Sequence, residues 1–253
     1  MLEGKIALVT GAGKGLGRAI AESLHAERAH VIAVARTQSD LDALEVDLGD
    51  RIETWALDAT GEDILSRIEE LTQLDILINN AGYSGASILE DTNDDIWTSD
   101  LNGNLNGAYF CARNVIDDMK SIDGSAIVNI SSVNGLAALG DPAYSAAKAG
   151  IISLTKSLAL EYGRYGIRAN VICPGTVRTP IWDHRIERNP EILEKLVRWY
   201  PLRRVANPID IVRTAMFLAS DDAAAITGAV LPVDCGLSAG NLVMTREITL
   251  SDM

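Results

Sequence analysis

Short apolar segments alternate with longer segments of helical periodicity from one end of this 253-residue chain to the other. The first pair shows the pattern: residues 5–10 form a short β-rich run bounded by glycine, and apolar residues recur at helical spacing over 15–28. Such alternation predicts a parallel sheet with helices on both faces, because right-handed crossovers carry each helix back across the sheet. We therefore expect one α/β domain over 1–253, with a doubly wound Rossmann fold of about seven strands.

The remaining elements follow from the same patterns. Further strands are expected at 30–35, 52–57, 75–79, 125–131, 167–173 and 229–233. Helices are expected from about 39 onward, at 62–71, at 95–120 and at 144–162. Within a loop-and-helix insertion around 175–200, we expect a substrate loop or lid at 181–201. Residues 237–253 would form a C-terminal tail that either closes a pocket, its own or a neighbouring subunit's, or hangs free.

Composition narrows the classes of function. The apolar fraction of 47% is enough for a sizeable core, and no apolar run is long enough to span a membrane. A net charge of −13 argues against nucleic acid or an acidic carrier protein as a partner. The first residues lack a signal-peptide layout, and Cys111, Cys173 and Cys235 lie far apart. We expect a cytoplasmic protein with neither a disulfide framework nor a metal site.

A glycine-rich turn lies between the first predicted strand and helix. The segment 10–17 reads Thr-Gly-Ala-Gly-Lys-Gly-Leu-Gly. Glycines permit a tight turn, and the N-terminus of the following helix favours a pyrophosphate anion. The spacing departs from the common G-x-G-x-x-G fingerprint, and a glycine turn without a ligand is the alternative. The cofactor-binding residues expected here are Gly11, Gly13, Lys14, Gly15, Leu16 and Gly17.

The end of the second predicted strand bears on the choice of nicotinamide cofactor. Enzymes that use NAD(H) usually place an acid there to accept from the ribose hydroxyls, and Val34-Ala35-Arg36-Thr37 contains none. Arg36 would form a fork with a 2′-phosphate, and Lys14 would approach the same group. Together they favour NADP(H). If both are solvated surface cations, NAD(H) is the alternative.

Two later strand ends complete the expected cofactor site. Asp58, followed by Ala59, would accept from the adenine amino group, although an ordinary loop aspartate is nearly as good an interpretation. Asn80, Ala81 and Gly82 would line the adenosine ribose, with Asn80 also tying neighbouring strands together. All these residues follow strands, where ligands bind in parallel sheets.

A tyrosine–lysine pair supplies the expected chemistry. Tyr144 and Lys148 lie four apart in a predicted helix, shortly after Ser132, so the ammonium would lie beside the phenol. A neighbouring cation lowers a phenol pKa that starts near about 10, which allows proton exchange closer to neutral pH. Such pairs also arise by chance, and the weight of this one comes from its neighbouring motifs.

Taken together, these motifs resemble the short-chain dehydrogenase/reductase family. The resemblance covers nearly the whole chain and rests on segments in family order: 10–17, 79–82, Asn104, Ser132, Tyr144 with Lys148, and Pro174-Gly175. It implies an NAD(P)-dependent oxidoreductase that interconverts a carbonyl and a secondary alcohol. Lys14 and the segment 33–41 are most similar to L-xylulose reductases and tetrameric carbonyl reductases, which again implies NADP(H).

The resemblance also implies roles for individual residues. Tyr144 would act as general acid in reduction and general base in oxidation. Lys148 would lower the tyrosine pKa and hold the nicotinamide ribose. Ser132 would hydrogen-bond the substrate oxygen, with Ser131 as a competing assignment.

Other implied roles concern the surroundings of this catalytic set. Asn104 would support a water chain to Lys148, with Asn102 and Asn106 as nearby alternatives. The residues wrapping the nicotinamide end would be Pro174, Gly175, Val177 and Thr179.

The substrate is less constrained. Contacts are expected from 181–201, from 135–143 and from the loop after Gly82. The first segment contains the aromatic residues Trp182, Trp199 and Tyr200. Aromatic residues in such a segment are more typical of lid or interface packing than of substrate recognition. His184 is expected on the surface. A sugar, polyol or small diketone would suit a mixed polar pocket.

Rival functions remain open at this stage. They are an NAD-dependent polyol or alcohol dehydrogenase, a 3-ketoacyl reductase and a non-enzymatic NADP(H) sensor. The chain's acidity argues against docking an acidic carrier, and the complete Ser-Tyr-Lys set argues against a sensor. The family implies a homodimer or homotetramer. It usually has two glycines where this chain has Cys235-Gly236, a departure near the tail.

Overall fold

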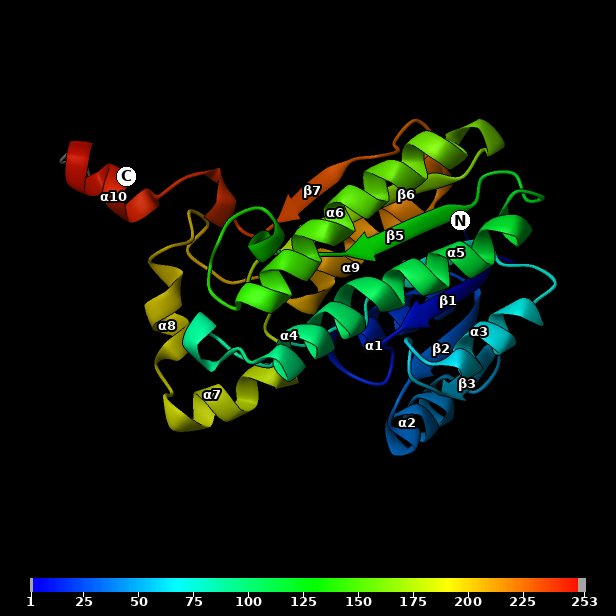
Figure 1. Ribbon diagram of the computed structural model, residues 1–253, viewed down its shortest axis with the longest axis horizontal. Helices are drawn as coiled ribbons and strands as arrows, with labels where there is room; N and C mark the ends of the chain where they lie inside the picture. The colour runs from blue at the N-terminus through cyan, green and yellow to red at the C-terminus, as the bar shows by residue number, and fades with distance from the viewer. Residues whose placement is uncertain (1, 250–253) are drawn as a thin grey trace.

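In the computed structural model, which describes residues 2–249, seven parallel strands form one sheet in the order β3-β2-β1-β4-β5-β6-β7 (Figure 1). Their bounds are β1 Ile6–Thr10, β2 His30–Ala35, β3 Ile52–Ala56, β4 Ile76–Asn79, β5 Ala126–Ile130, β6 Arg168–Pro174 and β7 Val230–Val233. The order reverses between β1 and β4, which makes their carboxyl ends the switch point where ligands bind. The predicted Rossmann fold is confirmed.

The central strands are buried on both faces, which explains their nearly continuous apolar sequences. Leu8 of β1 lies opposite Ile32 of β2 and Leu77 of β4, and all three contribute to the core on one face. Their neighbours Val9 and Ile78 contribute to the core on the other face. Burying each such side chain stabilises the fold by roughly 1.5–3 kcal/mol.

Helices cover both faces of the sheet. One face is covered by α1 (Gly15–Ala26), α2 (Gln38–Leu48) and α9 (Pro208–Ala219). The other is covered by α3 (Glu62–Glu69), α5 (Gly107–Met119) and α6 (Pro142–Tyr162), with α4 (Asp94–Leu101) beside α6 (Figure 1). Among the described helices, none is long and apolar enough to cross a membrane.

The prediction of one continuous helix over 95–120 is wrong, because the helix is interrupted. A π-helical turn at Asn102–Asn106 separates α4 from α5. Within it, the Asn104 side chain donates to the carbonyl of Asp100 at 2.9 Å, so this backbone carbonyl of the preceding turn accepts a hydrogen bond from a side chain. Turns of this kind are frequent at functional sites. Apolar periodicity continued through the segment and gave no sign of the interruption.

The insertion after β6 contains two short helices, α7 (Asp183–Arg188) and α8 (Ile192–Val197). It ends on Tyr200, which is 1% exposed and donates its hydroxyl to Thr176 Oγ1 at 2.8 Å. Tyr200 therefore anchors the insertion, in line with the packing role expected for its aromatic residues. The side chain of His184, predicted to be exposed, lies outside what the structure describes.

The C-terminal segment leaves the body of the molecule beyond β7. After a short turn at Leu237–Ala239, α10 (Leu242–Thr249) projects outward, away from the sheet (Figure 1). Leu237 still lines the main cavity, whereas the remainder of the predicted tail, 250–253, lies outside the described residues. The other short turns are Leu89–Asp91, Val133–Gly135, Gly163–Tyr165, Pro180–Trp182 and Asp221–Ala223.

Candidate active site

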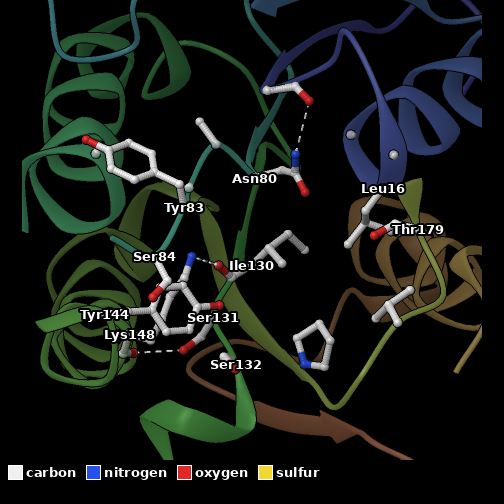
Figure 2. Close-up of a pocket in the computed structure, with 18 of the residues that line it drawn as sticks. Leu16, Asn80, Tyr83, Ser84, Ile130, Ser131, Ser132, Tyr144, Lys148 and Thr179 are labelled. Carbon is white, nitrogen blue, oxygen red and sulfur yellow. Dashed lines mark hydrogen bonds between the residues drawn. The ribbon is translucent and has the colours of Figure 1, made fainter. Parts of the chain in front are cut away.

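A cavity of about 1490 Å³ opens at the carboxyl ends of the strands. It exceeds the roughly 300–1,000 Å³ of ordinary small-molecule pockets, so a dinucleotide and a second ligand both have room. Every residue predicted to bind the cofactor lines it, from the glycine turn through Arg36 and Asn80 to Thr179. Figure 2 shows Tyr144, Lys148 and Ser132 converging on one side of this cavity, with Leu16 and Thr179 on the other.

The glycine turn is held by close backbone packing. Gly11 and Gly15 have φ of 67° and 59°, in the left-handed region that favours glycine. A Cβ added at Gly17 would overlap the carbonyl oxygen of Gly11. Asn80 Nδ2 donates to the carbonyl of Thr10 at 3.1 Å, so the ends of β1 and β4 are tied as predicted.

An aromatic platform that sequence reasoning missed lies at the adenosine corner. The guanidinium of Arg36 sits 5.6 Å from the ring centre of Tyr83, within cation–π range. The Tyr83 hydroxyl donates to the carbonyl of Ser99 at 2.9 Å, and a Cβ at Gly103 would overlap the ring. The signal available in the sequence was an aromatic residue directly after Asn80-Ala81-Gly82.

The same corner contains an acid that lies outside the strand end on which the cofactor prediction was based. Asp40, in the first turn of α2, lines the cavity, and a Cβ added at Gly13 would lie 2.9 Å from its Cβ. The strand end alone has no acid, but the fold brings one in from the next helix. Asp58 is exposed, and its Oδ1 accepts from the Thr60 backbone N–H at 2.9 Å, closing a local turn.

The two candidate serines have different surroundings. Ser131 is buried and donates to the carbonyl of Lys148 at 2.7 Å, which ties β5 to α6. Ser132 lies beside Tyr144, and its hydroxyl lowers the phenol pKa by hydrogen bonding. Its Oγ also accepts from the backbone N–H of Asn134 at 3.2 Å. The geometry therefore favours Ser132 over Ser131 as the residue facing a substrate.

The tyrosine–lysine pair differs from the prediction in its electrostatics. Burial raises the pKa of Tyr144, with the hydrogen bond from Ser132 opposing it and the charges of Asp141 and Asp100 adding to it. Burial lowers the pKa of Lys148 to about 8. Lys148 Nζ lies 5.4 Å from the tyrosine ring centre and donates to the carbonyl of Ile130 at 2.9 Å (Figure 2).

The predicted lowering of the phenol pKa is therefore wrong, because burial raises that pKa above its usual value. Helical spacing places the two groups on one face, as predicted, but it says nothing about burial. Desolvation disfavours the charged form of each group, so it raises the phenol pKa and lowers the amine pKa. Lys148 is still mostly protonated at neutral pH, since its pKa of about 8 lies above 7.

Of the three asparagines, Asn102 lines the cavity, and Asn104 lies behind Gly82, on the side of Lys148. It is 1% exposed and donates to the carbonyl of Tyr83 at 2.7 Å. Its Oδ1 is buried and accepts no hydrogen bond from the part of the chain that the structure describes. Asn102 and Asn106 instead bond each other at 2.6 Å. A Cβ added at Gly82 would lie 3.1 Å from Lys148 Nζ and overlap Asn104 Oδ1, so both polar atoms adjoin the cavity wall.

Close packing also shapes the expected nicotinamide end. A Cβ at Gly175 would lie 3.1 Å from the Cβ of Asp234, and a Cβ at Gly15 would lie 3.7 Å from that of Thr179. Val177 pairs with Ala206 in an isolated bridge. The long cavity, the glycine cradle and the buried Asn104 oxygen fit a nicotinamide dinucleotide. No group of three or more potential metal ligands occurs among the described residues.

Comparison with known proteins agrees with this geometry. A family model described as enoyl-(acyl carrier protein) reductase matches residues 11–238. The chain is 45% identical to an oxidoreductase of the short-chain dehydrogenase/reductase family from Burkholderia thailandensis, whose crystal structure superposes with a TM-score of 0.94 over 98% of each chain. The chain belongs to the short-chain dehydrogenase/reductase family. As such it is an NAD(P)-dependent oxidoreductase.

Two curated relatives of this reductase family cover almost the whole chain. An uncharacterised oxidoreductase of Schizosaccharomyces pombe is 39% identical over 98% of this chain and 96% of its own length. The 3-oxoacyl-[acyl-carrier-protein] reductase of Haemophilus influenzae is 37% identical over 93% of this chain and 99% of its own. The family and the enzyme class predicted from sequence are confirmed.

Proposed function

We propose that this family member is an NADPH-dependent carbonyl reductase of the cytoplasm that acts on a small polar ketone, such as a sugar or a diketone. The observation that carries the proposal is the convergence of Ser132, Tyr144 and Lys148 in one cavity with the glycine turn. A reducing compartment is supported by three buried cysteines, none of which forms a disulfide within the described residues.

The chain's own residues would handle the substrate oxygen and its proton. The bound nicotinamide cofactor supplies a hydride to the carbonyl carbon. Ser132 would donate to the carbonyl oxygen, and Tyr144 would transfer its phenolic proton to the same oxygen as negative charge grows there. A raised tyrosine pKa keeps that proton in place at neutral pH, which suits reduction. The Lys148 ammonium would stabilise the tyrosinate until water reprotonates it.

The choice of NADP(H) rests on charge at the adenosine corner. Lys14 and Arg36 line the cavity there and are exposed, so they can meet a 2′-phosphate. Asp40 lines the same corner and would repel that phosphate or accept from a ribose hydroxyl. Two cations against one carboxylate favour NADP(H). An NAD-dependent polyol or alcohol dehydrogenase is the function that Asp40 would favour.

A second candidate function is reduction of a 3-oxoacyl group, favoured by the 37% identical acyl-carrier-protein reductase. Acyl carrier proteins are acidic, and a net charge of −13 disfavours their approach. A homodimer or homotetramer is also proposed. Its support is that large apolar side chains on α5 and α6 are exposed, with Tyr109 at 41% and Leu160 at 86%.

The proposal is tested by separating turnover from cofactor binding. Tyr144→Phe should reduce NADPH-dependent ketone reduction by at least about 10²–10⁴-fold, while titration by nicotinamide fluorescence shows nearly unchanged NADPH binding. Retained turnover would exclude Tyr144 as the acid. In the same titration, Arg36→Asp should abolish a preference for NADPH over NADH. A wild type that binds NADH better would instead indicate the NAD-dependent dehydrogenase.

A further inference from the structure

Two loops, 83–88 after β4 and 136–141 before α6, form one wall of the cavity beside Tyr144. Ser84 Oγ donates to Asp141 Oδ1 at 2.8 Å, and the backbone N–H of Asp141 donates to the carbonyl of Ser87 at 3.0 Å. Figure 2 shows Ser84 next to Tyr144 on this side of the cavity. Because both bonds join the same two loops, Asp141 holds a fixed place in the wall.

The first of these loops is anchored from behind by a second carboxylate. Asp100 of α4 is 1% exposed, and its two oxygens lie 3.0 and 3.1 Å from the backbone nitrogen of Gly85, which donates to them. No ion pair to Asp100 is formed within residues 2–249. The wall therefore carries negative charge in two layers, with Asp141 in front and Asp100 behind.

Asp141 adopts a conformation that a structural role alone does not require. It directly precedes α6, yet its side chain caps no backbone N–H of the helix, and its φ is 48°, in the left-handed region. Non-glycine residues held there are strained and are concentrated at functional sites. Oδ1 takes the hydrogen bond from Ser84, while Oδ2 accepts none from the described part of the chain, and the residue lines the cavity.

We propose that Asp141 determines substrate specificity by accepting a hydrogen bond from a neutral hydroxyl group close to the reacting carbonyl. This inference rests on the proposed function, and it names the substrate class as hydroxyketones, in contrast to keto acids. An ionised carboxylate can only accept, so it binds a hydroxyl donor. Such charge-assisted bonds are roughly twice as strong as neutral ones. A carboxylate or phosphate on the substrate would meet like charge at this position.

Other charged groups around Tyr144 do not cancel this effect. The Lys148 ammonium donates to the carbonyl of Ile130 at 2.9 Å and forms no ion pair with Asp141 among the described residues. Arg185 of α7 also lines the cavity, and its guanidinium lies 4.9 Å from the ring centre of Trp182. Asp100 and Asp141 both act on the tyrosine as negative charges, and Cys173 acts in the same direction. If an anionic ketone is the true substrate, Arg185 is the group that would bind it.

The test compares three four-carbon ketones of similar size: 2-butanone, 1-hydroxy-2-butanone and 2-oxobutanoate. We expect the wild type to have the highest kcat/KM for the hydroxyketone and the lowest for the anion, with NADPH as reductant. Asp141→Asn keeps the size and tolerates left-handed backbone. It should lower the preference for hydroxyketone over butanone about tenfold, because the bond loses its charge. It should raise the relative rate for 2-oxobutanoate.

Asp95→Asn is the matched control, since Asp95 is an exposed acid on α4 at the rim of the same cavity. It should leave all three ratios unchanged. Unchanged ratios in Asp141→Asn, or a wild type that prefers 2-oxobutanoate, would overturn the role of Asp141 while leaving carbonyl reduction intact. Absence of turnover with all three ketones would instead overturn the proposed function.

Discussion

The two halves of the cavity differ in which residues adopt left-handed backbone. In the cofactor half, the left-handed positions of the first turn are glycines, Gly11 and Gly15. On the substrate side, the left-handed glycines Gly140 and Gly236 adjoin non-glycine residues that are also left-handed, Asp141 at φ 48° and Cys235 at φ 55°. Left-handed backbone costs a non-glycine residue roughly 1–2 kcal/mol, so the substrate side bears strain that the cofactor half avoids.

The difference follows from what each half must contact. A dinucleotide is bound by backbone amides at close range, so side chains in the turn would obstruct it. A small ketone is distinguished by side-chain groups, so a strained position is useful when it presents a carboxylate or hydroxyl. The cofactor half is therefore constrained by packing of the main chain, and the substrate half by contacts between loops.

The largest expected effect is on the main-chain packing of the cofactor half. Gly17→Ala should destabilise the fold by about 3 kcal/mol or more and abolish NADPH binding, because the added methyl overlaps the Gly11 carbonyl and would also meet Asn80. Urea unfolding and cofactor titration would measure both effects.

Gly163→Ala is the control for that change, since a Cβ there has no neighbour within 4 Å and φ is −56°. It should be neutral or stabilise by roughly 0.4–1 kcal/mol. Comparable loss of stability in both variants would show that packing in the turn is not what constrains the cofactor half.

The next largest effect is expected on stability, from the buried Lys148, which lies between the cofactor half and the substrate half of the cavity. Its pKa falls from 10.5 to about 8 on folding, so between these values the unfolded chain binds more protons than the folded one. Stability should rise over that pH range, and below pH 8 the charged lysine should destabilise the fold by about 3 kcal/mol. Lys148→Met should therefore be inactive but more stable than wild type at pH 7, by up to that amount.

The advantage of Lys148→Met should shrink as the pH approaches 10, which urea unfolding at several pH values would reveal. Lys156→Met is the matched control, because Lys156 is exposed on the same helix. It should show no such pH dependence. A constant difference between Lys148→Met and wild type from pH 7 to 10 would contradict the role given to burial.

The smallest effect should be confined to the substrate half. Asp100→Ala removes the acceptor for the Gly85 N–H and should cost about 1 kcal/mol. Because the loop it anchors carries Ser84, KM for the ketone should rise while the dissociation constant for NADPH stays the same. Asp95→Ala, on the exposed side of α4, should change stability by less than about 0.5 kcal/mol. Equal weakening of ketone and cofactor would show that the halves are not separable.

The sequence by itself determined the order of strands and helices and most of the cofactor half. Strand β2 has the predicted bounds, and the other six strands differ from their predicted bounds by at most one residue at each end. Apolar runs and glycine spacing are local properties of the chain. Parallel strands buried on both faces have nearly continuous apolar sequences, so they can be recognised from the sequence alone. The catalytic spacing was equally local, since helix geometry places Tyr144 and Lys148 on one face.

Only the tertiary structure decided the contacts between segments far apart in the chain. Asp40 enters the adenosine corner from α2, Tyr83 lies under Arg36, and Ser84 of one loop donates to Asp141 of another in the same wall of the cavity. Burial, and with it the direction of the Tyr144 pKa, is likewise a property of the packed molecule. Periodicity and spacing describe one segment at a time, whereas electrostatics and specificity depend on which segments meet.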